Sequence, residues 1–171
     1  TVEQHERLFI LNYPGGSRLN RTIGMIVTAM LTAKSGYKIG FQFDPYRIIL
    51  DVPARTTVKD LLAILKGFVP EVGSLLRFAI KDSPSLKPQL LHSARKMGAI
   101  APDADIGKFG MKKLMEAYSD TPLYTEAVER FLFHQLDENG MEDFIHQINS
   151  GDISIKLSPK TPHGHAGLDP Y

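Results

Sequence analysis

Apolar and polar residues repeat with two different periods along this chain. In its first third, residues 5–13 form a β-prone apolar run closed by Pro14-Gly15-Gly16, and segments 37–43 and 47–52 alternate in the manner of a hairpin with one apolar face. Between the run and the hairpin, apolar residues recur at helical spacing over 19–31. The first 53 residues are therefore predicted to form a β-α-β-β unit with a small antiparallel sheet.

Beyond this unit the period changes to about 3.6 residues and remains helical. Thr57 followed by Asp60 resembles a capping box, and Thr121-Pro122 has the form of a helix cap followed by proline at the first helical position. The predicted helices lie near 58–65, 69–81, 86–97, 109–118, 122–134 and 138–149. A short apolar run at 153–157 is expected to return to the sheet as a last strand.

These elements together predict an α+β fold. The expected domain covers 1–157, with an α/β part at 1–53, an array of about five to six helices at 54–152 and the returning strand at 153–157. Residues 158–171 have no period and are expected to form an extended or disordered tail.

Composition narrows the class of protein without identifying it. The 171 residues, 43% of them apolar, suffice for one core, and no run approaches the roughly 20 apolar residues that span a membrane. The chain starts at Thr1 without the basic-then-apolar layout of a signal peptide, so we expect an internal fragment or a processed chain. The absence of cysteine excludes disulfides and fits a cytoplasmic protein.

The net charge of +1 conceals a strong segregation of charge along the chain. Segment 86–115 carries Lys87, Arg95, Lys96, Lys108, Lys112 and Lys113 against Asp103 and Asp105. Segment 116–143 carries Glu116, Asp120, Glu126, Glu129, Asp137, Glu138, Glu142 and Asp143 against Arg130. Only the first segment could face phosphate groups, although each could also be a solvated helix surface.

Motifs for catalysis and metal binding are not found. No G-x-x-x-x-G-K-[ST] loop or acidic box of a nucleotide hydrolase is present, so the chain alone is not expected to hydrolyse ATP or to be an enzyme. Segment 137–140 is a poor match to a calcium loop, since its glycine comes too early. His163 and His165 lack a third ligand. We therefore expect no catalytic residue, metal or cofactor in this chain.

A candidate nucleic-acid surface remains on two neighbouring predicted helices. Their basic side chains are Lys87, His92, Arg95 and Lys96 on the first and Lys108, Lys112 and Lys113 on the second, and the helix over 19–31 adds Arg18 and Arg21 at its start. Such edges could follow a phosphate backbone, but lysines near helix ends more often provide solubility or complement the helix dipole. Candidates for base stacking are Tyr13, Tyr46, Phe109, Tyr118 and Tyr124, of which the last two flank the acidic segment.

Several segments carry a family resemblance. Residues 5–10 (HERLFI) and 16–24 (GSRLNRTIG) resemble a strand and glycine turn followed by a helix with the pattern "R-x-N-x-x-L-G". Residues 92–98 (HSARKMG) resemble the pattern "H-V-A-R-R-F-G", and residues 118–127 (YSDTPLYTEA) resemble "Y-x-x-T-P-V-Y-x-E-A". Residues 148–153 (INSGDI) resemble "I-x-x-G-E-I". These motifs, in this order, are similar to the DEAD/H helicase-associated domain that follows the motor and winged-helix domains in the Large helicase-related (Lhr) family.

The resemblance implies a part of an ATP-dependent, 3′-to-5′ translocating DNA helicase. In that family context the domain would help to enclose single-stranded or tailed DNA, or an RNA–DNA hybrid, beside the motor and winged-helix domains, while ATP and magnesium would serve the full-length helicase. By similarity the expected contacts or their supports are Arg18, Asn20, Arg21, His92, Arg95 and Lys96. This chain has Pro88-Gln89 where many relatives have an aromatic and a basic residue, and it has no Trp. An electrostatic, sequence-tolerant contact is therefore expected.

Two other functions are compatible with the residues. A structural domain would brace the motor and winged-helix domains through its acidic helices, without touching DNA. A glycosylase-like activity on DNA would need a buried carboxylate near the basic groove, and the sequence shows no candidate for one.

Overall fold

The computed structural model describes residues 6–67, 71–81 and 83–158 of the chain. An antiparallel sheet is built from β1 (Glu6–Asn12), β2 (Gly40–Asp44) and β3 (Arg47–Pro53), in the order β1-β3-β2. The central strand β3 buries Ile48, Leu50 and Val52 on one face, as its alternating sequence predicted.

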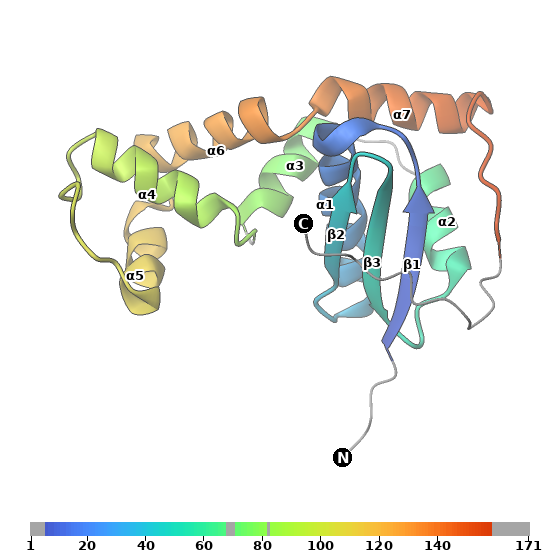
Figure 1. The fold of residues 1–171 in the computed structure, drawn as a ribbon, viewed down its shortest axis with the longest axis horizontal. Helices are drawn as coiled ribbons and strands as arrows, with labels where there is room; N and C mark the ends of the chain where they lie inside the picture. Colours follow the sequence, from blue (N-terminus) through green and yellow to red (C-terminus); the bar gives the residue numbers. More distant parts are fainter. Residues whose placement is uncertain (1–5, 68–70, 82, 159–171) are drawn as a thin grey trace, which may run out of the picture.

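Helix α1 (Gly16–Ser35) lies across one face of this sheet (Figure 1). Its inner surface buries Ile23, Ile26, Val27 and Leu31, whose helical spacing is evident in the sequence. The helix ends where Gly36 adopts the left-handed conformation, with φ of 71°, and donates its N–H to the Thr32 carbonyl. The β-α-β-β prediction is thus confirmed.

Six further helices follow among the described residues. They are α2 (Val58–Gly67), α3 (Val72–Lys81), α4 (Leu86–Lys96), α5 (Lys108–Tyr118), α6 (Pro122–Gln135) and α7 (Glu138–Ser150). The predicted capping box starts α2, because the Thr57 N–H donates to the Asp60 carboxylate at 2.9 Å. Hydrogen bonds from Lys34 and from Thr57 hold the pKa of Asp60 well below its usual value.

The helices divide between the two ends of an elongated molecule (Figure 1). Helices α2 and α7 pack with α1 beside the sheet, and α4, α5 and α6 lie at the opposite end, with α3 packing against both α1 and α6. A bidentate ion pair joins α3 to α6, since Arg77 Nε donates to Glu129 Oε1 at 2.9 Å and Nη2 donates to Oε2 at 3.2 Å. The α+β class is confirmed, and the domain division at residue 53 stays a prediction.

The predicted returning strand at 153–157 is wrong for the described residues. After Gly151, with φ of 87°, the chain continues through 154–158 without regular secondary structure and without pairing to the sheet. Ile153 and Ile155 are half-buried and pack against the core, while Ser154 and Lys156 between them are exposed. The alternation therefore reflects side-chain packing of an extended segment that has no ladder of backbone hydrogen bonds. The predicted tail lies almost entirely outside the described residues.

Candidate nucleic-acid interface

Arg18 on α1 is bound to the end of α6. Its Nε donates to the Leu136 carbonyl at 3.1 Å, and Nη2 donates to the carbonyls of Phe133, at 2.9 Å, and Leu136. Carbonyls in the last turn of a helix lack partners within the helix, so the guanidinium satisfies groups that would otherwise need water. Close by, the hydroxyl of Thr22 accepts a hydrogen bond of 2.9 Å from the Asp137 N–H.

Arg21 lies one turn further along α1 at the same contact. Its Nη1 donates to Gln135 Oε1 at 2.7 Å, and its guanidinium carbon lies 4.9 Å from the ring centroid of Phe131 and 5.7 Å from that of Phe43. Burial lowers the pKa of Arg21, although an arginine remains charged in proteins. We call the contact of Arg18, Arg21 and Thr22 with residues 131–137 the α1–α6 joint.

Asn20 is fully buried and connects three parts of the sheet region. Its side-chain amide donates to the Tyr13 carbonyl at 2.9 Å and to the Asp44 carbonyl at 2.8 Å, which ties the β1–α1 connection to the end of β2. The three candidate residues on α1 thus all make intramolecular contacts. Arg18 and Arg21 hold the α1–α6 joint, and Asn20 holds the sheet.

The candidates on α4 fall into two groups. Lys87, His92 and Lys96 are exposed and have no hydrogen-bond or ion-pair partner in the described part of the chain. His92 and Lys96 are one helical turn apart and share a side of α4, whereas Lys87 lies about 140° around the helix from His92. Leu86, Leu90, Ser93 and Ala94 form the buried side of α4.

Arg95 belongs to the second group, because its side chain is hydrogen-bonded to the loop that follows α4. Its Nη2 donates to the Ala104 carbonyl at 2.8 Å, while its Nε is buried without a partner among the described residues. The side chain therefore holds loop 98–107 against α4.

Replacing Arg95 by alanine should loosen this loop. We expect faster amide hydrogen exchange over 98–107 and a loss of about 1 kcal/mol in the free energy of unfolding, since one hydrogen bond and a partly buried side chain are removed. Hydrogen exchange read by mass spectrometry measures the first effect and urea unfolding the second. Lys96→Ala, next to it on the exposed side, is the control. Equal exchange in the two variants would show that Arg95 does not hold the loop.

On α5 the candidate lysines differ in their surroundings. Lys112 forms an exposed pair with Glu116, at 3.8 Å between Nζ and Oε1, and such pairs contribute little stability. Lys113 is exposed and lines a groove. The Lys108 side chain lies outside the described residues.

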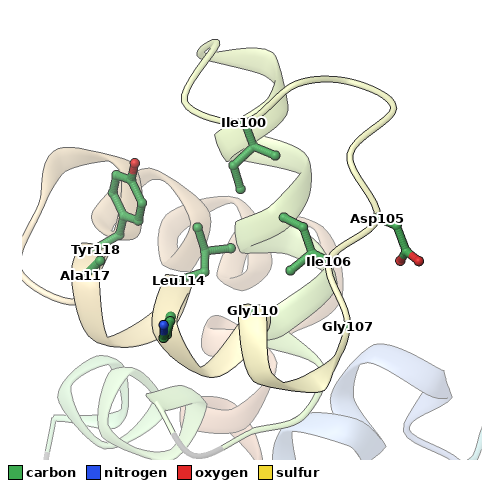
Figure 2. Close-up of a pocket in the computed structure, with 9 residues that line it drawn as sticks. Ile100, Asp105, Ile106, Gly107, Gly110, Leu114, Ala117 and Tyr118 are labelled. Carbon is green, nitrogen blue, oxygen red and sulfur yellow. The ribbon is translucent and has the colours of Figure 1, made fainter.

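This groove lies between α5 and the loop held by Arg95, and its volume is about 530 Å³. Its floor and walls are mostly apolar and include Ile100, Ile106, Leu114, Ala117 and the ring of Tyr118. Figure 2 shows Tyr118 at one end, Asp105 at the other with its carboxylate pointing outward, and the apolar side chains between them.

The candidate stacking residues differ in how exposed their rings are to solvent. Tyr124 is buried, and Tyr13 packs against Phe144 with ring centroids 4.8 Å apart. Tyr46, 72% exposed, and the half-buried Tyr118 remain accessible, while the Phe109 side chain lies outside the described residues.

The sequence prediction missed Phe133, which is 75% exposed on α6. A signal for it is present in the sequence, because Phe131, Leu132 and Phe133 are consecutive on a helix. Three consecutive residues cover about 200° of a helix, so they cannot all face one core. Phe131 and Leu132 are the two that are buried.

Two other kinds of site receive no support from the structure. Asp137, in the segment compared with a calcium loop, caps α7 by accepting a hydrogen bond of 2.9 Å from the Gly140 N–H. Within 6–67, 71–81 and 83–158, no group of three or more His, Asp or Glu residues is arranged to hold a metal ion.

No helix in these ranges is long and apolar enough to cross a membrane.

A family model described as DEAD/H associated matches residues 1–162. The chain belongs to the DEAD/H associated family. This membership confirms the resemblance that the sequence motifs indicated.

A solved structure has a similar fold. It is the helicase Lhr of Mycobacterium smegmatis bound to ssDNA and AMP-PNP, with a TM-score of 0.66 and 16% sequence identity. The match covers 85% of this chain and 20% of the mycobacterial chain, so this DEAD/H associated domain spans about a fifth of that helicase. No curated protein sequence matches the chain. At this identity the likeness shows the fold alone.

Proposed function

We propose that this DEAD/H associated domain is a non-catalytic part of an ATP-dependent, 3′-to-5′ DNA helicase and that it helps to hold single-stranded DNA beside the motor and winged-helix domains. The observation that carries this proposal is the set of exposed basic side chains on α4 and α5, of which His92 and Lys96 share one side of α4. Lys87, His92 and Lys96 on α4 and Lys112 on α5 stand out into solvent, and none of them holds the fold together in the way that Arg18, Asn20, Arg21 and Arg95 do.

Such a surface would bind the phosphate backbone and not particular bases. Lysine ammonium groups are mobile point charges that attract phosphate without fixed geometry. Their binding releases counterions and is therefore weakened strongly by salt. The contact would let a strand slide, as a translocating helicase needs, and the motor domains would supply ATP and magnesium chemistry.

The test is a fluorescence-anisotropy titration of the chain with labelled single-stranded DNA at low and moderate salt. Lys96→Glu on α4 combined with Lys112→Glu on α5 should weaken binding about tenfold or more at low salt, and should reduce the slope of log affinity against log salt by about two, one for each lysine. Lys59→Glu with Lys66→Glu on α2 makes the same change of charge on exposed residues at the other end of the molecule.

Equal weakening by both pairs would show that only net charge matters and would contradict an interface on α4. Arg95 is unsuitable for this test, since its replacement also frees the loop that it holds.

A second candidate function is to brace the other domains of the polypeptide, and one observation favours it. Phe133 on α6 is 75% exposed and Phe78 on α3 is 62% exposed. Acidic residues near these rings are paired with arginines, Glu129 with Arg77 and Glu126 with Arg130. Large exposed aromatic rings in neutral surroundings suit a protein contact. If bracing is the only function, the chain will have no measurable DNA affinity even at low salt.

A further inference from the structure

We infer that the groove beside α5 receives an unstacked base of the bound strand, so that the domain would hold a base as well as phosphates. This inference rests on the proposed function and specifies where and how the strand is held. It differs from the purely electrostatic contact that the sequence suggested.

The size and lining of the groove suit a ligand with an apolar face. Its volume of about 530 Å³ lies within the range of about 300–1,000 Å³ that is usual for small-ligand sites. Ile100, Ile106 and Leu114 offer apolar contacts, and Tyr118 offers an aromatic ring at one end (Figure 2). A base has apolar faces that stack on such side chains irrespective of its sequence.

The charge around the groove favours a nucleic acid over an apolar peptide. The groove is formed within and just after the basic segment 86–115 and Lys113 lines it, while Lys112, one residue earlier on α5, is exposed and paired with Glu116 at 3.8 Å. The one acidic side chain in the lining, Asp105, points its carboxylate outward (Figure 2). A strand whose phosphates lie on α4 and α5 could therefore turn a base inward without bringing phosphate against a carboxylate.

The groove also selects for single strands. In a duplex both faces of each base are stacked, and taking a base out costs unpairing and unstacking. A base of a single strand is free to turn into the groove at much smaller cost. Arg95 acts as a positioning residue in this arrangement, because it holds the loop that carries Ile106.

The experiment compares two labelled oligothymidylates of equal length in titrations with the chain. One carries all of its bases, and the other carries abasic tetrahydrofuran sites that keep the phosphates and remove the bases. We expect the abasic strand to bind about tenfold more weakly, since stacking of one base on an aromatic ring is commonly worth that much.

Ala117→Leu then tests the location, because Ala117 is exposed and lines the groove, and leucine would fill part of it without adding an aromatic ring. This variant should bind the normal strand as weakly as the abasic one, and its binding to the abasic strand should be unchanged. Ala63→Leu, at an exposed alanine of α2, is the matched control and should behave as the unmodified chain.

The outcomes separate this inference from the proposed function. Equal affinity for the two strands overturns the base-binding groove and leaves the electrostatic contact standing. A preference for the normal strand that Ala117→Leu leaves intact places the base elsewhere and also overturns the inference. No binding of either strand at low salt overturns both proposals.

Discussion

Replacing Asn20 by alanine should lower the free energy of unfolding by about 3 kcal/mol. The change removes two hydrogen bonds from a fully buried amide and leaves the Tyr13 and Asp44 carbonyls without that donor, and each buried polar group so deprived costs about 1–3 kcal/mol. Urea unfolding with linear extrapolation measures the effect. The loss should be accompanied by local opening where β1 meets α1.

Two further variants make this result specific. Asn20→Asp keeps the shape of the side chain but replaces the donor by an oxygen that faces two carbonyls, so its loss should be at least as large. Asn149→Ala, at an exposed position of α7, should change stability by no more than about 0.5 kcal/mol. If Asn20→Ala were as mild as Asn149→Ala, the two hydrogen bonds of Asn20 would contribute little to the stability of the fold.

Gly24→Val should destabilise the protein by a similar amount, about 3 kcal/mol, for a steric reason. A Cβ atom at Gly24 would lie 2.3 Å and 2.4 Å from two carbon atoms of the Phe41 ring, far inside contact distance. The valine would push the ring aside or lift α1 from β2. Gly24→Ala should cost less, because alanine improves helix propensity by about 1 kcal/mol over glycine.

Thermal or urea unfolding of a double-mutant cycle tests this cause. In a Phe41→Ala background the ring is gone, so Gly24→Ala should become neutral or stabilising, and the coupling energy should be at least about 1 kcal/mol. Gly67→Ala, at the end of α2 with nothing within 4 Å of the added atom, is the control for helix propensity alone. Additive effects of the two substitutions would mean that the close approach of α1 to β2 does not explain the glycine.

Local features of the fold could be predicted from the sequence because each has a short-range cause. The alternation of β3, the helical spacing of α1 and the capping box of Thr57 and Asp60 are set by residues within a few positions of each other. The strand expected at 153–157 failed because strand formation also needs a partner edge. A pattern of alternating side chains does not contain that information.

The roles of individual arginines were less predictable. Arg18, Arg21 and Arg95 stand in motif-like segments and on polar helix faces, so charge alone made them candidates for phosphate contacts. Their observed partners are Leu136, Gln135 and Ala104, and the first two are more than 110 residues away in the chain. The three exposed α4 side chains, Lys87, His92 and Lys96, have no such long-range partner, and their contact with phosphate stays a prediction.

The groove beside α5 also could not be predicted from neighbouring residues in the sequence. In the sequence, Tyr118 is a candidate for stacking that borders the acidic segment. The structure places its ring in a groove that opens among residues of the basic segment, since the loop after α4 folds back onto α5. The position of Tyr118 next to the acidic segment in the sequence did not indicate which charged residues lie near its ring in the fold.

The α1–α6 joint also has a consequence for the order in which the chain can fold. Its hydrogen bonds link residues 114 to 118 positions apart, so they close only after nearly the whole domain has left the ribosome. Until then α1 can dock on the hairpin and the Thr22 hydroxyl can donate to the Arg18 carbonyl within the helix, but the Arg18 guanidinium lacks its partners at the end of α6. We therefore expect the two ends of the molecule to acquire structure separately and to join last, in a slow step set by the entropy of closing so long a loop.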